Sequence, residues 1–314
     1  TNSYSQNALI SGKIANFTGD SVSITIWDDY FHMVKTFQSN VDKEKGEFLL
    51  SIPLKNPSAT MLHTGKDNIS LYLKPQDNIK CYFDYRSIVE SLKFEGNRAS
   101  HYNYFAEYQK RFKLPHAMFT RPDWKDIFEM QPKEFKNYRK TKVKDDMEYL
   151  YSYCNTNSVT DDFKHYCETE IKYSYYYALI NYSSLRSYFK KTDDKLPPDF
   201  YDDIHKDLFK IDDNLNSQNY VDALKTYISN FKSGKYDYPD KFFPKAMTIA
   251  SNELTSKSLY VCQSYLIKDL LMGDASTHIK DSLTNSFLAN CPLNELSHFI
   301  TLEYTKSIQS RARK

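Results

Sequence analysis

Ser21-Val-Ser-Ile-Thr-Ile-Trp27 alternates polar with apolar side chains, which is the two-residue period of a β-strand that buries one face. The same logic, less strictly followed, predicts three further strands, at residues 46–52, 69–73 and 78–84. Turn-forming residues separate these stretches at Gly19-Asp20, Lys45-Gly46, Gly65-Lys66 and Pro75-Gln-Asp77. Short strands at this spacing are typical of an antiparallel sandwich or barrel rather than of a parallel sheet with crossover helices.

The period changes after Gly96, and residues 99–112 place Phe105, Tyr108 and Phe112 at helical spacing. Similar patterns predict helices from Pro132 to about Leu150, from Thr160 to about Phe189, from Pro197 through Leu208, from Ser217 to Lys232, from Pro244 to Met272, around residues 279–287, and from Pro292 to Ile308. We therefore expect a segregated α+β fold, with an N-terminal antiparallel β-sandwich domain over residues 1–97 and an all-helical domain over residues 98–314. Since no low-complexity linker joins the two, the first helix should pack on the sheet.

The composition excludes several classes of protein. The 42 Lys and Arg residues against 40 Asp and Glu give a net charge of +2, without the basic excess of a nucleic-acid binder. The seven glycines are dispersed, whereas nucleotide-binding phosphate loops need closely spaced glycines. No long apolar run occurs, so we expect no transmembrane segment. Aromatic residues make up 16% of the chain, which indicates a substantial buried core.

The five cysteines predict free thiols rather than a disulfide framework. Their odd number leaves one unpaired in a monomer, and no Cys-x-x-Cys motif of a dithiol redox site occurs. A bridge between Cys154 and Cys167 across a helical hairpin is not expected, because the two positions are about 9 Å out of step along the helices. Such a bridge needs Cα atoms within about 7 Å. Buried free thiols are the favoured interpretation.

The sequence offers no recognisable catalytic arrangement. The eight histidines include no His-Glu-x-x-His or similar ligand pair, and His165 and Cys167, two residues apart on a helix, point to different sides. No Gly-x-Ser-x-Gly nucleophile motif occurs. Paired aspartates such as Asp161-Asp162 lie at expected helix starts, where they favour the helix dipole and a hydrated surface. We therefore predict no catalytic residue, no metal site and no cofactor.

Tyrosine clusters are the most unusual feature of the predicted helices. One interpretation is an interaction surface at Tyr175, Tyr176 and Tyr177, an aromatic platform for a sugar, a peptide or a partner protein. Three adjacent residues cover most of the circumference of a helix, so at least one ring should lie partly exposed or against a neighbouring domain. The other interpretation is a tyrosine-rich core, which we favour because the 27 tyrosines are spread through the whole chain.

Short motifs of the strand region resemble a known module. Asp42-Lys-Glu-Lys-Gly46-Glu-Phe48 is similar to its Asp…Gly-x-Phe hairpin, and Leu73-Lys-Pro-Gln-Asp-Asn-Ile79 to its Leu-x-Pro-Gly-Asp-x-Ile turn. Phe94-Glu-Gly96 is similar to its Phe-x-Gly strand before the first helix, and residues 198–201 and 217–220 resemble the helical segment that follows. The chain thus resembles the N-terminal region of TlpA-like and AhpC-TSA-type thioredoxin-fold proteins of Gram-negative cell envelopes. Gln76 stands in place of the family's turn glycine, and a type I turn would accept it.

The resemblance implies a periplasmic protein or one anchored to the outer membrane. It also implies a signal peptide, often a lipoprotein signal that supplies a lipid anchor, upstream of Thr1, and a thioredoxin-like domain with Cys-x-x-Cys after the helices. No catalytic residue of the family is carried over, because this chain has no such motif. From the residues alone, a start at Thr1 fits either a cytoplasmic protein or one whose signal segment has been removed. The basic end, residues 309–314, fits a solvated tail, a junction with a further domain or a protease cut.

Our leading hypothesis is a non-catalytic accessory module of an envelope thiol-disulfide oxidoreductase. Its partner would be the thioredoxin-like domain that follows it covalently, or a client protein. The alternative is a free-standing envelope protein that binds a glycan or a peptide through exposed tyrosines. A third interpretation, a hydrolase, would require two carboxyl groups that converge in one cleft.

Overall fold

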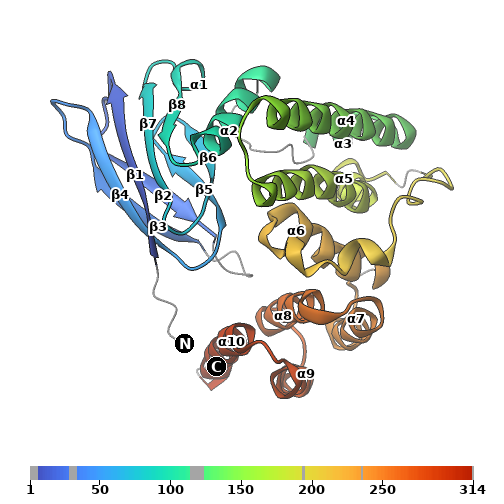
Figure 1. Cartoon of the computed structure of the whole chain (residues 1–314). Helices are drawn as coiled ribbons and strands as arrows, with labels where there is room; N and C mark the ends of the chain where they lie inside the picture. Colours follow the sequence, from blue (N-terminus) through green and yellow to red (C-terminus); the bar gives the residue numbers. More distant parts are fainter. Residues whose placement is uncertain (1–5, 28–33, 114–123, 193–194, 235, 313–314) are drawn as a thin grey trace. The chain divides into compact units, whose positions relative to one another are not determined.

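The computed structural model describes residues 6–27, 34–113, 124–192, 195–234 and 236–312, and it confirms the α+β fold (Figure 1). Strands occupy the N-terminal part and helices the remainder. The strands are β1 (Gln6–Ala15), β2 (Ser21–Ile26), β3 (Lys35–Asn40), β4 (Glu47–Leu54), β5 (Ser58–His63), β6 (Asn68–Leu73), β7 (Asn78–Asp84) and β8 (Lys93–Gly96), with the short helix α1 (Ile88–Ser91) between the last two.

The strands form two sheets that face each other across one core. One sheet has the order β4-β1-β7-β8 and the other β3-β2-β5-β6. All pairs are antiparallel, as expected, except β1 with β7, which run parallel with Ile10 opposite Ile79. The residues of β4 alternate strictly between exposed and buried, so that Leu50 and Ile52 point inward. They share a core with Ile24 of the opposite sheet. Burial of each such aliphatic side chain stabilises the folded state by about 1.5 to 3 kcal/mol.

The helical part begins with α2 (Ala99–Phe112), whose bounds are those predicted from the sequence. The other helices are α3 (Trp124–Glu129), α4 (Pro132–Thr156), α5 (Asp161–Lys190), α6 (Gln218–Thr226), α7 (Pro239–Glu253), α8 (Ser256–Met272), α9 (Thr277–Asn290) and α10 (Asn294–Ala312). Two 3₁₀ turns, η1 (Lys206–Phe209) and η2 (Asp212–Asn216), precede α6, and a π-helix, η3 (Tyr227–Lys232), continues it. In the described part of the chain, none of the helices combines the length and the hydropathy needed to cross a bilayer.

The chain divides into two compact units. Unit 1 comprises Thr1–Arg121 and Lys144–Ile171, and unit 2 comprises Pro122–Val143 and Lys172–Lys314. Because α4 and α5 cross these boundaries, each contributes one part to each unit. The change from strands to helices near residue 97 lies where the sequence places it, but the compact units do not follow that change. The sandwich, α2 and the hairpin end of α4 and α5 belong together in unit 1.

Two helix predictions were wrong. The stretch 197–208 forms turns and the start of η1 instead of a helix. The backbone N–H groups of Phe200, Asp202 and Ile204 bond to carbonyls three residues back, not four as in an α-helix. The predicted helix from Pro244 to Met272 is two helices, α7 and α8. The second has its own start, where Asp212 accepts the backbone N–H groups of Lys257 and Ser258 at 3.1 and 2.9 Å.

The turn between β6 and β7 holds a buried carboxylate that ties the sandwich to α2. Asp77 is 2% exposed and accepts the backbone N–H of Lys74 at 2.7 Å. The Tyr102 hydroxyl of α2 donates to the same oxygen, and the Arg98 guanidinium lies 3.4 Å from the other. Gln76 has φ +69°, so it adopts the left-handed conformation that favours glycine, and the expected type I turn is wrong.

His101 joins the N-terminus of α2 to that of α5 as a neutral imidazole. Its Nε2 accepts the backbone N–H of Thr160 at 3.0 Å, which leaves Nδ1–H to donate to the carbonyl of Arg98, also at 3.0 Å. Burial, aided by the charge of Arg98, lowers the pKa of His101 to about 4. Protonation at Nε2 would remove the acceptor of the Thr160 N–H.

Acid should therefore destabilise unit 1 through His101. Because the pKa is below its ordinary value of 6.5, the unfolded chain takes up the proton first. The stabilisation is complete above about pH 6.5 and is lost as the pH falls toward 4, by at most about 1.4 kcal/mol per pH unit. Urea unfolding between about pH 7 and pH 4 measures this slope. His101→Gln should remove this component, whereas the same change at exposed His298 should leave it, and equal slopes in the two variants would contradict the assignment.

Candidate functional site

The three tyrosines that the sequence singles out lie on α5 in unit 2 and do not form an exposed row. Tyr175 is 7% exposed, and Tyr176 and Tyr177 are partly buried. The rings of Tyr175 and Tyr176 meet edge to face with their centroids 5.5 Å apart. A tyrosine-rich core accounts for this arrangement better than an exposed platform does. That a partner binds at these three residues stays a prediction.

Tyr175 belongs to a polar cluster around Asp203. Its hydroxyl donates to Oδ2 of Asp203 at 2.6 Å, and the Nζ atoms of Lys136 and Lys140 lie 3.3 and 3.0 Å from the same oxygen. Burial alone would raise the pKa of Asp203, but these hydrogen bonds and the lysine charges outweigh it and lower the pKa. Burial and the neighbouring carboxylate raise the pKa of Tyr175. With both pKa values far from neutral, the cluster is a structural anchor rather than a proton-exchanging pair.

A pocket of about 670 Å³ opens elsewhere in unit 2, among α5, α6, η3, α7 and α8. This volume is within the range of sites that bind small molecules. Its apolar lining includes Phe242 and Phe243, consecutive residues of α7, and Leu266 of α8, all of which are buried. Tyr236, in the segment before α7, is half exposed at 50% and meets Phe242 and Phe243 edge to face, at 4.9 and 5.5 Å between centroids. An exposed aromatic ring is therefore fixed at this pocket by buried ones.

The polar lining of the pocket is dominated by an ion pair. Lys225 of α6 and Asp269 of α8 lie 3.1 Å apart between Nζ and Oδ2, and both side chains are partly exposed. The ammonium group also lies 5.2 Å from the centre of the Tyr265 ring. Burial, and then the charges of Asp274 and Asp269, raise the pKa of Tyr236, so its hydroxyl remains protonated at neutral pH. The pair leaves hydrogen-bonding capacity on both groups, because a carboxylate accepts at two oxygens and an ammonium donates three bonds.

The π-helix η3 forms the wall of this pocket that carries Ser229 and Asn230. The wider turn of η3 is closed by Ser233. The carbonyl oxygen of Ile228 accepts the backbone N–H of Ser233 at 3.0 Å and the Ser233 hydroxyl at 2.7 Å. The Ser229 hydroxyl donates to Oδ1 of Asn230 at 3.0 Å, which orients the amide of an exposed side chain. Single π turns within α-helices are rare and occur often at functional sites. The irregular wall therefore supports the interpretation of this pocket as a site.

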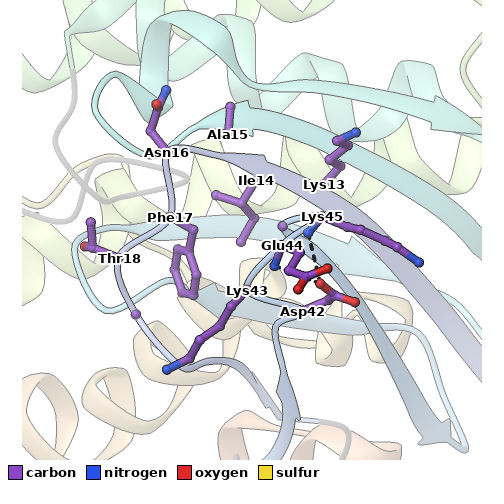
Figure 2. Close-up of a pocket in the computed structure, with 12 residues that line it drawn as sticks. Lys13, Ile14, Ala15, Asn16, Phe17, Thr18, Asp42, Lys43, Glu44 and Lys45 are labelled. Carbon is purple, nitrogen blue, oxygen red and sulfur yellow. Dashed lines mark hydrogen bonds between the residues drawn. The ribbon is translucent and has the colours of Figure 1, made fainter.

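A second, smaller hollow of about 330 Å³ lies in unit 1, between the β1–β2 turn and the β3–β4 hairpin. Figure 2 shows Lys13, Lys43 and Lys45 around it, with their side chains pointing in different directions. Lys43 pairs with Asp20 at 2.7 Å, and both are well exposed. Asp42 accepts the backbone N–H groups of Glu44 and Lys45 at 2.9 Å each, and these bonds lower its pKa. The hollow thus follows from turn geometry, and its lysines do not converge on a common point.

Burial makes three of the cysteine thiols poorly reactive. All five cysteines are free, and Cys81, Cys167 and Cys262 are buried. Burial raises the pKa of Cys81 and Cys262 to about 12, and it also raises the pKa of Cys167. Within the residues that the structure describes, no three His, Cys, Asp or Glu side chains gather as a metal site.

Sequence reasoning missed the pocket of unit 2, although one signal was present. Tyr236-Asp-Tyr238 lies between Gly234, which has φ +79° after η3, and Pro239, the first residue of α7. Aromatic residues in such a helix break cannot all be buried by helical packing, and Tyr236 and Tyr238 are both exposed. Lys225 and Asp269 had no sequence signal, because they are 44 residues apart on different helices.

The chain was compared with protein-family models, with curated proteins and with solved structures, and none of the three comparisons found a match.

Proposed function

We propose that this chain is a non-catalytic accessory module of a cell-envelope thiol-disulfide oxidoreductase similar to the TlpA-like proteins. It would hold a thioredoxin-like domain or a client protein, in the periplasm or at a lipid-anchored position on the outer membrane. One observation supports this most directly: the residues that carry the resemblance serve to build and lock the fold. Motifs with that role mark a shared module rather than a shared active site.

The structural role of these motifs is specific. Asp42 caps the β3–β4 hairpin, and Asp77 binds Arg98 and Tyr102 of the segment that follows the sandwich. Gly96 has φ +108°, and a Cβ atom there would lie 2.5 Å from the carbonyl oxygen of Asn78, so only glycine fits. The Asp42 and Gly96 positions fix the sandwich itself, and the Asp77 contacts join it to α2, which is what a rigid carrier needs.

The accessory role predicts inert thiols. At about pH 8, a chromogenic disulfide reagent should react quickly with at most Cys154 and Cys291, because the other three thiols are buried and largely protonated. All five should react in denaturant. The Cys154→Ser/Cys291→Ser variant should show no fast reaction in the native state. Fast reaction of Cys81, Cys167 or Cys262 in the folded chain would contradict this prediction.

The native polypeptide provides the direct test of the proposed function. Antibodies raised against this chain should recover, from the cell-envelope fraction, a polypeptide larger than 37.0 kDa. Its peptides, identified by mass spectrometry, should include a thioredoxin-like Cys-x-x-Cys segment. A native polypeptide of 37.0 kDa without such a segment would overturn the proposal.

The alternative function is the binding of a glycan or a peptide. It was expected to use the tyrosines of α5, but the observation that favours it is Tyr236. The buried position of Tyr175 does not support it, whereas Tyr236 is an exposed ring beside a pocket. The third interpretation, a hydrolase, has no comparable support, because the polar lining of this pocket pairs one carboxylate with one ammonium group.

A further inference from the structure

We propose that the pocket of unit 2 binds a neutral saccharide, with a sugar ring packed against Tyr236. The inference goes beyond the accessory role and is independent of it, because it concerns a site that the resemblance to TlpA-like proteins does not include. It rests on three properties of the pocket: its mixture of aromatic and polar lining, its balanced charge, and the helical origin of its walls.

The first property is the division of the lining into apolar and polar parts. A sugar ring has apolar C–H faces and a rim of hydroxyl groups, each of which donates and accepts hydrogen bonds. Tyr236 offers an exposed aromatic surface that edge-to-face contacts with the buried rings of Phe242 and Phe243 hold in place. Since the ring is already fixed, little conformational entropy is lost on binding. Such fixed tyrosines provide contact area at low entropic cost.

The polar groups of the pocket suit adjacent hydroxyls. Lys225 and Asp269 place a donor and an acceptor 3.1 Å apart, next to each other at the pocket surface. A pair of neighbouring hydroxyl groups can donate to the carboxylate and accept from the ammonium at the same time. Asn230, an exposed side chain on η3, adds an amide on another wall.

The second property is the charge balance of the lining. Among the described residues that line the pocket, Lys225 and Asp269 are the charged ones, and they neutralise each other. An anionic ligand such as a phosphate would meet the carboxylate of Asp269, and a cationic ligand would compete with Lys225. A neutral ligand avoids both repulsions, so the charge balance favours an uncharged polyol over a charged metabolite.

The third property, the helical origin of the walls, favours a saccharide over a peptide as the ligand. Extended peptides bind chiefly by pairing their backbone with an exposed strand edge or by lying in a groove for a polyproline helix. Apart from Gly234 and Tyr236, the residues that line this pocket lie on the helices α5, α6, η3, α7 and α8, in which backbone groups are mostly bonded within the helix. The pocket therefore offers side chains rather than backbone groups, as a saccharide site requires.

Calorimetric titration of the full chain tests the proposal. The probes are neutral oligosaccharides of glucose, xylose, mannose and N-acetylglucosamine at concentrations up to about 1 mM. At least one should bind saturably with one site per chain. Tyr236→Ala should weaken its binding by about tenfold or more, since aromatic anchors dominate such sites. Tyr236→Phe should retain most of the affinity because it keeps the ring.

Two further variants make the result specific. Tyr238→Ala removes an even more exposed ring two residues away that does not line the pocket, and this variant should bind the sugar as the original chain does. Asn230→Ala changes an exposed side chain on another wall and should weaken binding even if Tyr236→Ala were to unfold. The proposal is overturned if no sugar of the panel binds, if binding survives both pocket variants, or if unstructured peptides bind at this pocket and the sugars do not.

Discussion

Replacement of Phe163 by alanine is expected to lower the free energy of unfolding of unit 1 by about 3 to 5 kcal/mol, the range for a fully buried aromatic side chain. Phe163 lies in the first turn of α5 and is completely buried. Its ring meets those of His101 and Phe105 on α2 at 4.6 and 5.5 Å between centroids. It also meets the ring of Tyr72 on β6 at 6.5 Å. One side chain thus joins three elements of unit 1, and its removal leaves a cavity that none of them can fill alone.

Urea unfolding of the full chain, monitored by spectroscopic signals that report on unit 1, measures this loss of unfolding free energy. Phe163→Leu keeps much of the volume and should cost clearly less than Phe163→Ala. Leu49→Ala serves as the matched surface variant in the same unit, because Leu49 is 59% exposed on β4, and it should cost less than about 1 kcal/mol. A similarly small loss for Phe163→Ala would show that α5 does not depend on this contact.

A one-sided apolar pattern made β2 predictable from the sequence, and its lack explains why β3 and β5 were missed. β1 was missed although its buried residues Ala8, Ile10 and Ile14 stand on alternate positions. β2 has the alternation of a half-buried strand and was found, whereas β3 has no buried residue and carries no such pattern. In β5 the inward positions include Ser58 and Thr60, each 1% exposed. Their hydroxyls bond to backbone carbonyls, that of Ser58 to Ala59 at 2.8 Å. A search for hydrophobic periodicity does not detect a buried strand whose inward residues are polar.

Tertiary contacts decided the features of the helical part that the sequence did not predict. The break between α7 and α8 depends on Asp212, more than forty residues upstream of the amide groups that it caps. The pocket of unit 2 depends on Lys225 and Asp269, which meet only when α6 and α8 pack. Local patterns contain helix propensity and periodicity, but they do not contain such long-range pairs.

The contact of Arg311, near the C-terminus, was also not predictable from local sequence patterns. Of the basic residues near the C-terminus, Arg311 lies within α10 and pairs with Asp281 of α9 at 2.8 Å. A helix therefore continues where the sequence suggested a solvated tail or a junction, while Arg313 and Lys314 lie outside the described residues. The charge pattern alone could not show this, because the partner is thirty residues away.

Replacement of Asp77 by alanine should be about as damaging as the loss of Phe163, for an electrostatic reason. Asp77 accepts hydrogen bonds from the Lys74 backbone and the Tyr102 hydroxyl, and its charge faces Arg98, whose side chain is only 15% exposed. Removal of the carboxylate leaves a largely buried guanidinium without its counter-charge, which typically costs about 3 to 5 kcal/mol. Asp77→Asn keeps an acceptor for the turn but removes the charge, so its cost should be smaller.

A double-mutant cycle separates the effect of the lost Asp77 charge from the effect of the lost hydrogen bond in the turn. If the unpaired guanidinium causes most of the loss, then Arg98→Met in the Asp77→Ala background should restore at least about 1 kcal/mol, although Arg98→Met alone is destabilising. Tyr102→Phe should cost only about 1 to 2 kcal/mol, because it removes one hydrogen bond and no charge. The exposed Asp20–Lys43 pair is the control, and Asp20→Ala should leave unfolding unchanged. Additive effects of Asp77→Ala and Arg98→Met would mean that Asp77 acts through the backbone of the turn, with the sandwich and α2 joined by packing alone.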